Sequence, residues 1–322
     1  MAGIGFELKK LFEDKKLSKR VGAYLYSTFV AAGPWLISIF VVNILLFIAN
    51  KFFAEPGQKY LFMGTIVYSF IFSQLATSPF QLFITRYVSD KLYNKEYDKI
   101  APSFSGVSKM VIVFNLLISF LFYYGQPLPL YYKFLGTAFF VGVSLLWMIM
   151  IYLSALKNYR IIAFSYLLGG IFSVGLSLYL SHYPLSFPEY VDASNQLLAY
   201  FLGIYLTLAI LLYTLFLNFE RGEAEFSFLK KIKDYWQLIF IGFFYNLSLW
   251  IDDLIMWFSN LGVDIYQVYR YAPLYDNAVF LAFLTVIPTM VMFMVSVETD
   301  FYEHYKEFFH HILNDISLDR LE

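Results

Sequence analysis

The 322-residue chain contains no cysteine, few charged residues and only four histidines. The missing cysteine excludes disulfides, thiol nucleophiles and cysteine-ligated metals. Charged residues make up 15% of the chain, whereas soluble domains carry roughly 25%. The formal net charge is −1. Because the chain has no basic domain, nothing in it indicates a nucleic-acid partner.

The residues on which most catalytic sites depend are scarce as well. No histidine falls in a long apolar run, and no GxxxxGK[ST] nucleotide-binding loop occurs. An intramembrane hydrolase or acyltransferase needs a buried Ser–His pair or a histidine-bound metal. His304, His310 and His311 lie close together in sequence, but no acid is placed to complete a metal cage. We therefore expect no enzyme, no cofactor and no metal site.

Long apolar runs dominate what is present. The chain is 60% hydrophobic with a mean hydropathy of +0.61, well above the range of soluble domains. Runs of about 20 apolar residues span a bilayer as helices, so the sequence predicts an all-α polytopic membrane protein with about eight spans. The predicted spans are residues 27–48, 61–84, 110–124, 134–156, 161–180, 196–217, 236–258 and 274–297. The third is short and is expected to begin near Val107.

The distribution of positive charge predicts the orientation. With the N-terminus inside, 19 of the 23 Lys and Arg residues fall in inner segments and 4 in outer ones. Cytoplasmic loops carry such an excess of Lys and Arg, so the N-terminus is expected in the cytoplasm. Residues 1–20 form a basic amphipathic segment suited to the membrane surface. We also expect a cytoplasmic linker at residues 218–235 and a cytoplasmic amphipathic tail at 298–322.

Two adjacent acids interrupt the predicted span 236–258. Asp252 and Asp253 stand in an aromatic run that has no Lys, Arg, His or Glu. An acid near the middle of a span costs about 2.5–3.5 kcal/mol and is a functional candidate by default. Tyr245 is seven residues before Asp252 and shares its helical face, and Trp250 lies beside the acids. The alternative is that the span ends near Ile251 and leaves both acids at the outer interface.

Four further charged residues stand at the predicted span ends. Asp276 begins the eighth span and lies near the outer surface, and Arg270 precedes it. Arg86 ends the second span and Glu298 ends the eighth; both are interpreted as ordinary interface anchors. We keep Asp276 as a candidate for the transport pathway and the other three as candidates at the span ends.

Three stretches resemble one protein family. They are MAGIGFELKKLF at the start, AAGPWLISI in the first span, and YAPLYDNAVFLAFLTVIPTMVMFMVSVETDFYEHY near the end. Together they look like the PelG family, the inner-membrane exporters of the Pel exopolysaccharide, which are similar to lipid-linked oligosaccharide flippases. The resemblance implies a bacterial inner-membrane protein that exports an amino-sugar-rich polysaccharide for the biofilm matrix. It also implies partners: a cytoplasmic glycosyltransferase and small membrane proteins, one of which senses cyclic di-GMP.

The same resemblance implies a fold of two six-helix lobes around a central cavity. Residues 21–217 are then the first lobe, and residues 236–297 are the first two helices of a second. Because the family pattern has twelve spans and eight are predicted, we expect the chain to be part of a longer protein. The sequence leaves two other functions open. One is an ion-coupled antiporter of organic cations that uses Asp252 or Asp253, and the other is a non-transporting membrane scaffold for a glycosyltransferase.

Overall fold

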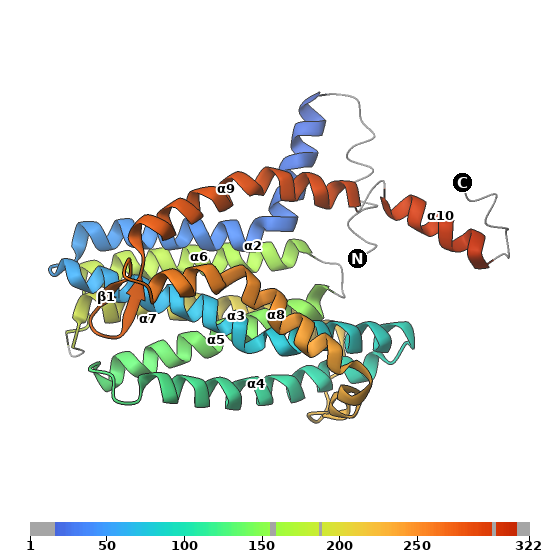
Figure 1. Ribbon diagram of the computed structural model, residues 1–322, viewed down its shortest axis with the longest axis horizontal. Coiled ribbons are helices and arrows are strands. Elements are labelled where there is room, and N and C mark those ends of the chain that lie inside the picture. The colour runs from blue at the N-terminus through green and yellow to red at the C-terminus, as the bar shows by residue number, and fades with distance from the viewer. Residues whose placement is uncertain (1–16, 155–158, 187–188, 298–300, 314–322) are drawn as a thin grey trace.

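The computed structural model describes residues 17–154, 159–186, 189–297 and 301–313 (Figure 1). In this part of the chain, seven helices are long and apolar enough to cross a membrane. These helices are α2 (Leu17–Phe52), α3 (Pro56–Tyr93), α4 (Ile100–Tyr123), α5 (Leu130–Ser154), α6 (Tyr159–His182), α7 (Val191–Asn218) and α8 (Ile232–Trp257). Each predicted span from the first to the seventh falls on one of them, and the all-α membrane fold is confirmed.

Two more helices, two 3₁₀ turns and a hairpin complete the described chain. The eighth predicted span falls on α9 (Pro273–Ser296), whose part Pro273–Val286 forms an apolar helix. An amphipathic helix, α10 (Tyr302–Leu313), follows it. Two 3₁₀ turns, η1 (Tyr97–Lys99) and η2 (Ser227–Lys231), lead into α4 and α8. The predicted segment 1–20 lies outside the described residues except for 17–20, as do residues 314–322 of the predicted tail.

The start of the third span was predicted too late. Helix α4 begins at Ile100, several residues before Val107. The reason is burial: Ile100, Ala101 and Ser103 are fully buried, and the segment before α8 covers this end of α4. Glu225 donates its backbone N–H to the carbonyl of Pro102 at 3.0 Å. Tertiary packing therefore extends the helix beyond its apolar run.

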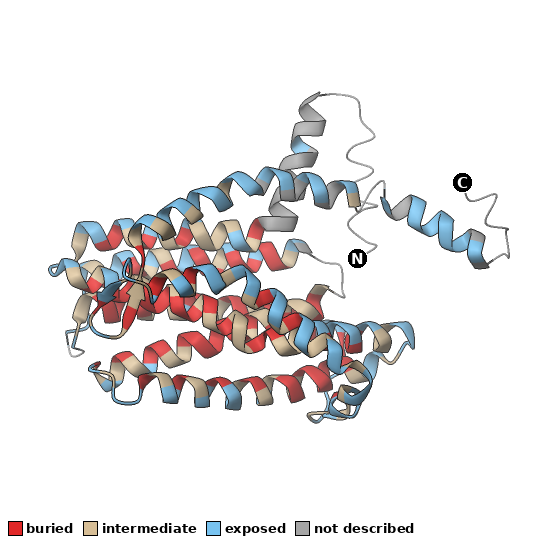
Figure 2. Cartoon of the chain, viewed as in Figure 1, coloured by how far each residue is buried: buried red, intermediate tan, exposed pale blue. Residues whose placement is uncertain are grey.

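The first six of these helices form one bundle, whose exterior is apolar. The closest pairs are α6 with α7, α2 with α6, α3 with α5, and α5 with α7. Figure 2 shows the buried residues concentrated between these helices. Large apolar side chains such as Phe47, Val113 and Phe134 are more than 60% exposed on the outside. In water such a surface is unfavourable, but in a bilayer it faces lipid.

Small residues let α6 and α7 approach closely. A methyl group at Gly169 would lie only 2.5 Å from the carbonyl oxygen of Gly203, and one at Gly203 the same distance from that of Gly169. Close backbone contact of this kind is a common source of helix association in membranes. These two positions therefore require glycine for packing.

Segments predicted on the same side of the membrane meet at the same end of the bundle. At one end, Ala54 after α2 donates its backbone N–H to Asp192 at the start of α7 at 2.8 Å. At the other end, the hydroxyls of Tyr87 in α3 and Ser227 in η2 are 2.8 Å apart. The alternation of loops between two ends agrees with the predicted succession of spans.

A β-hairpin between α8 and α9 was not predicted. Strands β1 (Val263–Ile265) and β2 (Tyr269–Tyr271) pair antiparallel, with Ile265 opposite Tyr269 (Figure 1). The turn contains two consecutive residues with positive φ, Tyr266 at 50° and Gln267 at 59°. Helix α9 begins directly after the hairpin, so the position of the hairpin sets where α9 starts.

Candidate functional site

Helix α8 packs along α3 through small and polar residues. A methyl group at Gly242 would lie 2.6 Å from the carbonyl oxygen of Ser78, so the two backbones nearly touch there. One helical turn further, Gln74 of α3 donates to the side-chain oxygen of Asn246 at 2.8 Å. Trp250 donates its indole N–H to Gln74 at 3.1 Å. Polar groups that would be costly in lipid thus satisfy one another between the helices.

The helix continues past the two adjacent acids. It ends at Trp257, so both Asp252 and Asp253 belong to the helix. Asp253 is only 6% exposed and lies on the stripe that α8 buries. Asp252 is exposed and accepts a hydrogen bond of 2.6 Å from the hydroxyl of Tyr275 in α9. The rotation of about 100° between successive residues therefore sends one acid inward and the other outward.

A row of exposed residues, all but Ile241 polar, runs along one face of α8. We call this row the α8 strip; its members follow one another three or four residues apart, as one helical face requires. They are Gln237, Ile241, Tyr245, Ser248 and Asp252, and all five are exposed. Tyr245 and Asp252 share this face as predicted, whereas Trp250 points toward α3. Exposed polar groups within a span typically face a water-filled cavity or another protein segment.

Asp276 connects α8 to the start of α9. Its carboxylate oxygens accept the indole N–H of Trp257 at 3.0 and 3.1 Å. One of them also accepts the backbone N–H of Ala272 at 3.0 Å. An acid that satisfies a free N–H in the first turn stabilises a helix start. Asp276 is thus engaged in holding the helix start, and the α8–α9 junction carries three carboxylates, those of Asp252, Asp253 and Asp276.

Arg270 and Arg86 each contact a nearby acid. The Arg270 guanidinium donates to the carbonyl of Gly262 at 3.2 Å and lies 3.3 Å from Asp264. It therefore ties the ends of the hairpin together. Arg86 pairs with Asp90 at 3.1 Å and is more than half exposed, as an interface anchor would be. Glu298 lies outside the described residues.

The hairpin inserts a tyrosine into the six-helix bundle. Tyr269 is 1% exposed, and its hydroxyl lies 3.0 Å from that of Tyr123 in α4 and 3.1 Å from that of Thr65 in α3. Thr65 in turn lies 2.7 Å from the hydroxyl of Tyr132 in α5. A methyl group at Gly64 would come within 2.9 Å of the Tyr269 ring. This buried hydroxyl network fixes β2 between three helices.

The hairpin tip contacts two loops at the same end of the bundle. Tyr266 donates its hydroxyl to Glu55 before α3 at 2.8 Å, and its ring meets that of Tyr190 before α7 edge-on at 5.3 Å. Burial first, and the bond to Glu55 second, raise the pKa of Tyr266 to about 12. Hydrogen bonds from Gln58 and then Tyr266 lower the pKa of Glu55. At physiological pH the Tyr266 hydroxyl is therefore protonated and donates to an ionised Glu55.

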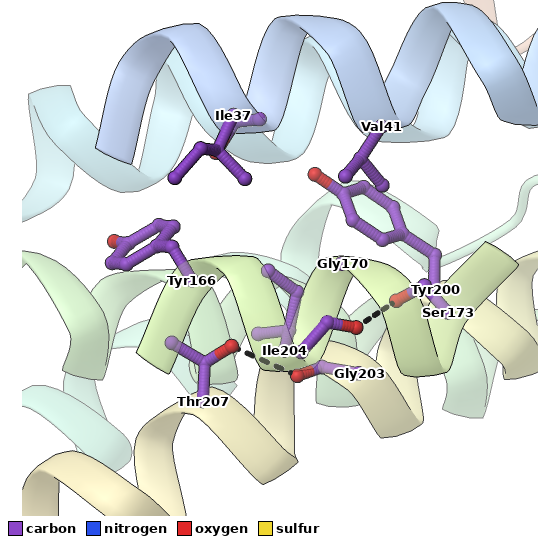
Figure 3. Close-up of a pocket in the computed structure, with 11 residues that line it drawn as sticks. Ile37, Val41, Tyr166, Gly170, Ser173, Tyr200, Gly203, Ile204 and Thr207 are labelled. Carbon is purple, nitrogen blue, oxygen red and sulfur yellow. Dashed lines mark hydrogen bonds between the residues drawn. The ribbon is translucent and has the colours of Figure 1, made fainter. Parts of the chain in front are cut away.

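A small cavity lies inside the bundle, away from α8. It is lined by α2, α6 and α7 (Figure 3), including Val41, Gly170, Tyr200 and Thr207. Its volume of about 10 Å³ is enough for about one water molecule. This cavity cannot hold a sugar residue, so the α8 strip is the better candidate for contact with a large substrate.

Sequence reasoning missed the hairpin, Tyr269 and the Gln74–Asn246 pair. The only available signals were alternation over Val263–Ile265 and Tyr269–Tyr271 and the presence of amides within spans.

The model of the PelG family, described as "Putative exopolysaccharide Exporter (EPS-E)", matches residues 1–322. No curated protein and no solved structure matches the chain.

Proposed function

Because the chain belongs to the PelG family of exopolysaccharide exporters, we propose that it moves an amino-sugar-rich polysaccharide across the bacterial inner membrane. The polymer would then supply a biofilm matrix. The family match over residues 1–322 is the observation that carries this proposal. The seven membrane-length helices support it, because an exporter of this kind works within the bilayer.

The α8 strip is the part of the proposed pathway that this chain supplies. Sugar hydroxyls need hydrogen-bond acceptors, which the Asp252 carboxylate provides, and sugar faces pack on aromatic rings such as that of Tyr245. Both side chains are exposed on the same face of α8. An acetylated polymer is neutral and would use the acid as an acceptor alone. A deacetylated polymer is cationic and would also be attracted by the charge.

The test compares the two acids. Asp252→Asn, Asp252→Ala, Asp253→Asn and Asp253→Ala are each assayed for secreted polymer per unit of membrane-inserted protein. Asp98→Asn and Asp98→Ala, in an exposed turn before α4, are the matched controls. Loss in Asp252→Ala but not Asp252→Asn would indicate a neutral acceptor, and loss in both a role for charge. Secretion at the parental level by all four variants would exclude the acids from the pathway. If deletion of the gene leaves secretion intact, export itself is refuted.

The inside position of the N-terminus is also part of the proposal. It rests on the excess of Lys and Arg in the segments at one end of the bundle. Lys95 and Ser186 are exposed in loops at opposite ends, and the native chain has no cysteine. In intact cells an impermeant thiol reagent should label Ser186→Cys and not Lys95→Cys. The reverse pattern would overturn the orientation.

The proposed partners are a cytoplasmic glycosyltransferase and small membrane proteins of a secretion complex. The resemblance to the family suggests them, and the basic segments at one end of the bundle would provide the docking surface. Co-purification of the glycosyltransferase from the native operon is the test. If that enzyme leaves the membrane on deletion of this gene, while all the Asp variants secrete normally, a scaffold role would be favoured over transport.

One observation favours a second function, ion-coupled exchange of organic cations. Asp253 is 6% exposed within α8, and no Lys or Arg among the described residues forms an ion pair with it. Buried acids of this kind serve as proton or cation relays in transporters. Loss of organic-cation efflux in Asp253→Asn, with polymer secretion retained, would favour the exchanger.

A further inference from the structure

We propose that α10 lies flat on the membrane surface at which α9 ends, with its aromatic face among the lipid headgroups. Three observations on the described part of the chain support this. The helix is amphipathic, no other described helix packs along it, and only a short connection separates it from α9. The inference depends only on α9 being a membrane helix and not on the proposed export.

One side of α10 is apolar and the other polar. Phe301, Tyr305, Phe308, Phe309 and Ile312 recur at helical spacing and are each 44–61% exposed. The opposite side carries Lys306, Glu307 and His310, which are exposed as well. A helix with a strong division between an aromatic and a charged face is typical of one that lies in the interface plane.

The aromatic face of α10 contacts itself and not the bundle. The rings of Tyr305 and Phe309 are 4.5 Å apart, and those of Phe301 and Tyr305 are 6.0 Å apart. No other helix of the described chain packs along α10, and Figure 1 shows it beyond the end of α9. The five exposed apolar side chains thus form an aromatic ridge along which no other described helix packs.

The short distance between α10 and the membrane indicates that lipid covers the aromatic face. Only residues 298–300 separate Val297 from Phe301, and the four residue steps between them reach at most about 14 Å. Since α9 is apolar up to Val297 in sequence, α10 must start close to the bilayer surface. Phe and Tyr side chains favour this region, where a ring can be apolar on one side and wet on the other.

The charge of α10 indicates which force holds it there. The helix has two acids, Glu303 and Glu307, and one Lys, Lys306, so with neutral histidines it has no net positive charge to attract anionic lipid. Insertion of the aromatic ridge must therefore supply the binding. We expect attachment to neutral and anionic bilayers alike, with little dependence on salt.

The experiment uses the full chain in nanodiscs of phosphatidylcholine with phosphatidylglycerol. A single bimane label is placed at Ile312→Cys on the apolar face or at Glu307→Cys on the polar face. Phe120→Cys, on the exposed apolar surface of α4, is the positive control, and Ser186→Cys in a loop is the negative control. Lipids with a nitroxide at acyl carbon 5 then quench any label that enters the bilayer.

We expect emission from Ile312→Cys to shift to the blue and to be quenched at least twofold more than that from Glu307→Cys. Adding Phe308→Glu with Phe309→Glu should remove this difference without changing the Phe120 label, which reports an intact bundle. Equal quenching at the two α10 sites would overturn the proposal. A blue shift at Ile312 without lipid quenching would also overturn it, because a protein surface would then cover the ridge.

Discussion

The ring of Tyr68 lies parallel to that of Trp257, with centroids 4.8 Å apart and 10° between the planes. Tyr68 belongs to α3 and Trp257 is the last residue of α8. The Tyr68 hydroxyl bonds both the N–H and the carbonyl of Arg270 at 2.9 Å, while Trp257 bonds Asp276. One stacked pair thus joins α3, α8, β2 and α9.

Trp257→Phe tests the bond between α8 and α9. Phenylalanine keeps an aromatic ring against Tyr68 but removes the N–H that Asp276 accepts. Loss of a hydrogen bond to a charged group costs about 1.5–3 kcal/mol, so the midpoint of thermal unfolding in detergent should fall. Trp236→Phe, on an exposed face of the same helix, should leave the midpoint unchanged. Equal midpoints for the two variants would contradict the assignment.

Tyr269→Phe tests the hydroxyl network. The substitution leaves the Tyr123 hydroxyl buried without its partner, and an unsatisfied buried group costs about 1–3 kcal/mol. The variant should therefore unfold at a lower temperature and expose the hairpin to protease. Tyr271→Phe is the matched control, because Tyr271 is on the same strand but outside this network. If both variants resist heat and protease as the parent does, the network does not hold the hairpin.

Gly242→Ala tests the close approach of α8 to α3. The added methyl group would meet the backbone carbonyl of Ser78 at 2.6 Å, and a helix backbone cannot rotate away. Overpacking costs about 1–3 kcal/mol, so we expect a lower unfolding midpoint and weaker protection of α8. Gly175→Ala places its methyl group in open space and should be neutral or slightly stabilising. Similar loss in both variants would indicate a general effect of glycine replacement.

Glu96→Gln tests the turn between α3 and α4. Bonds from Lys99 first and Lys91 second hold the pKa of Glu96 at about 2, below its ordinary 4.5. A lowered folded pKa stabilises the fold above the ordinary pKa, and this contribution disappears as pH falls through the folded pKa. The deficit in unfolding midpoint of the variant should thus be constant from about pH 7 to 5 and shrink from about pH 4.5 to 2. A deficit that does not change with pH would contradict the ion-pair account.

The spans could be predicted because length and apolarity alone define a membrane helix. The hairpin could not, because Asn or Gly usually occupies the positive-φ positions of a hairpin turn. In this three-residue loop Tyr266 and Gln267 adopt positive φ instead. A rotation of about 100° per residue makes the adjacent Asp252 and Asp253 diverge in any helix. Which of them turns inward depends on Gly242 and Asn246 facing α3, and the rotation of a helix about its axis is set by its neighbour.

The joint at Tyr68, Trp257 and Tyr269 has a mechanical consequence. Helix α8 packs on α3 at Gly242, Asn246 and Trp257. Strand β2 is held between α3, α4 and α5 by the hydroxyl network of Tyr269. A displacement of α8 would therefore move the six-helix bundle with it. Helix α9 is exposed along most of its described length, and Asp276 fastens only its first turn. Helix α9 also contacts α2, so a pull at its far end reaches the bundle through α2 as well as through its first turn.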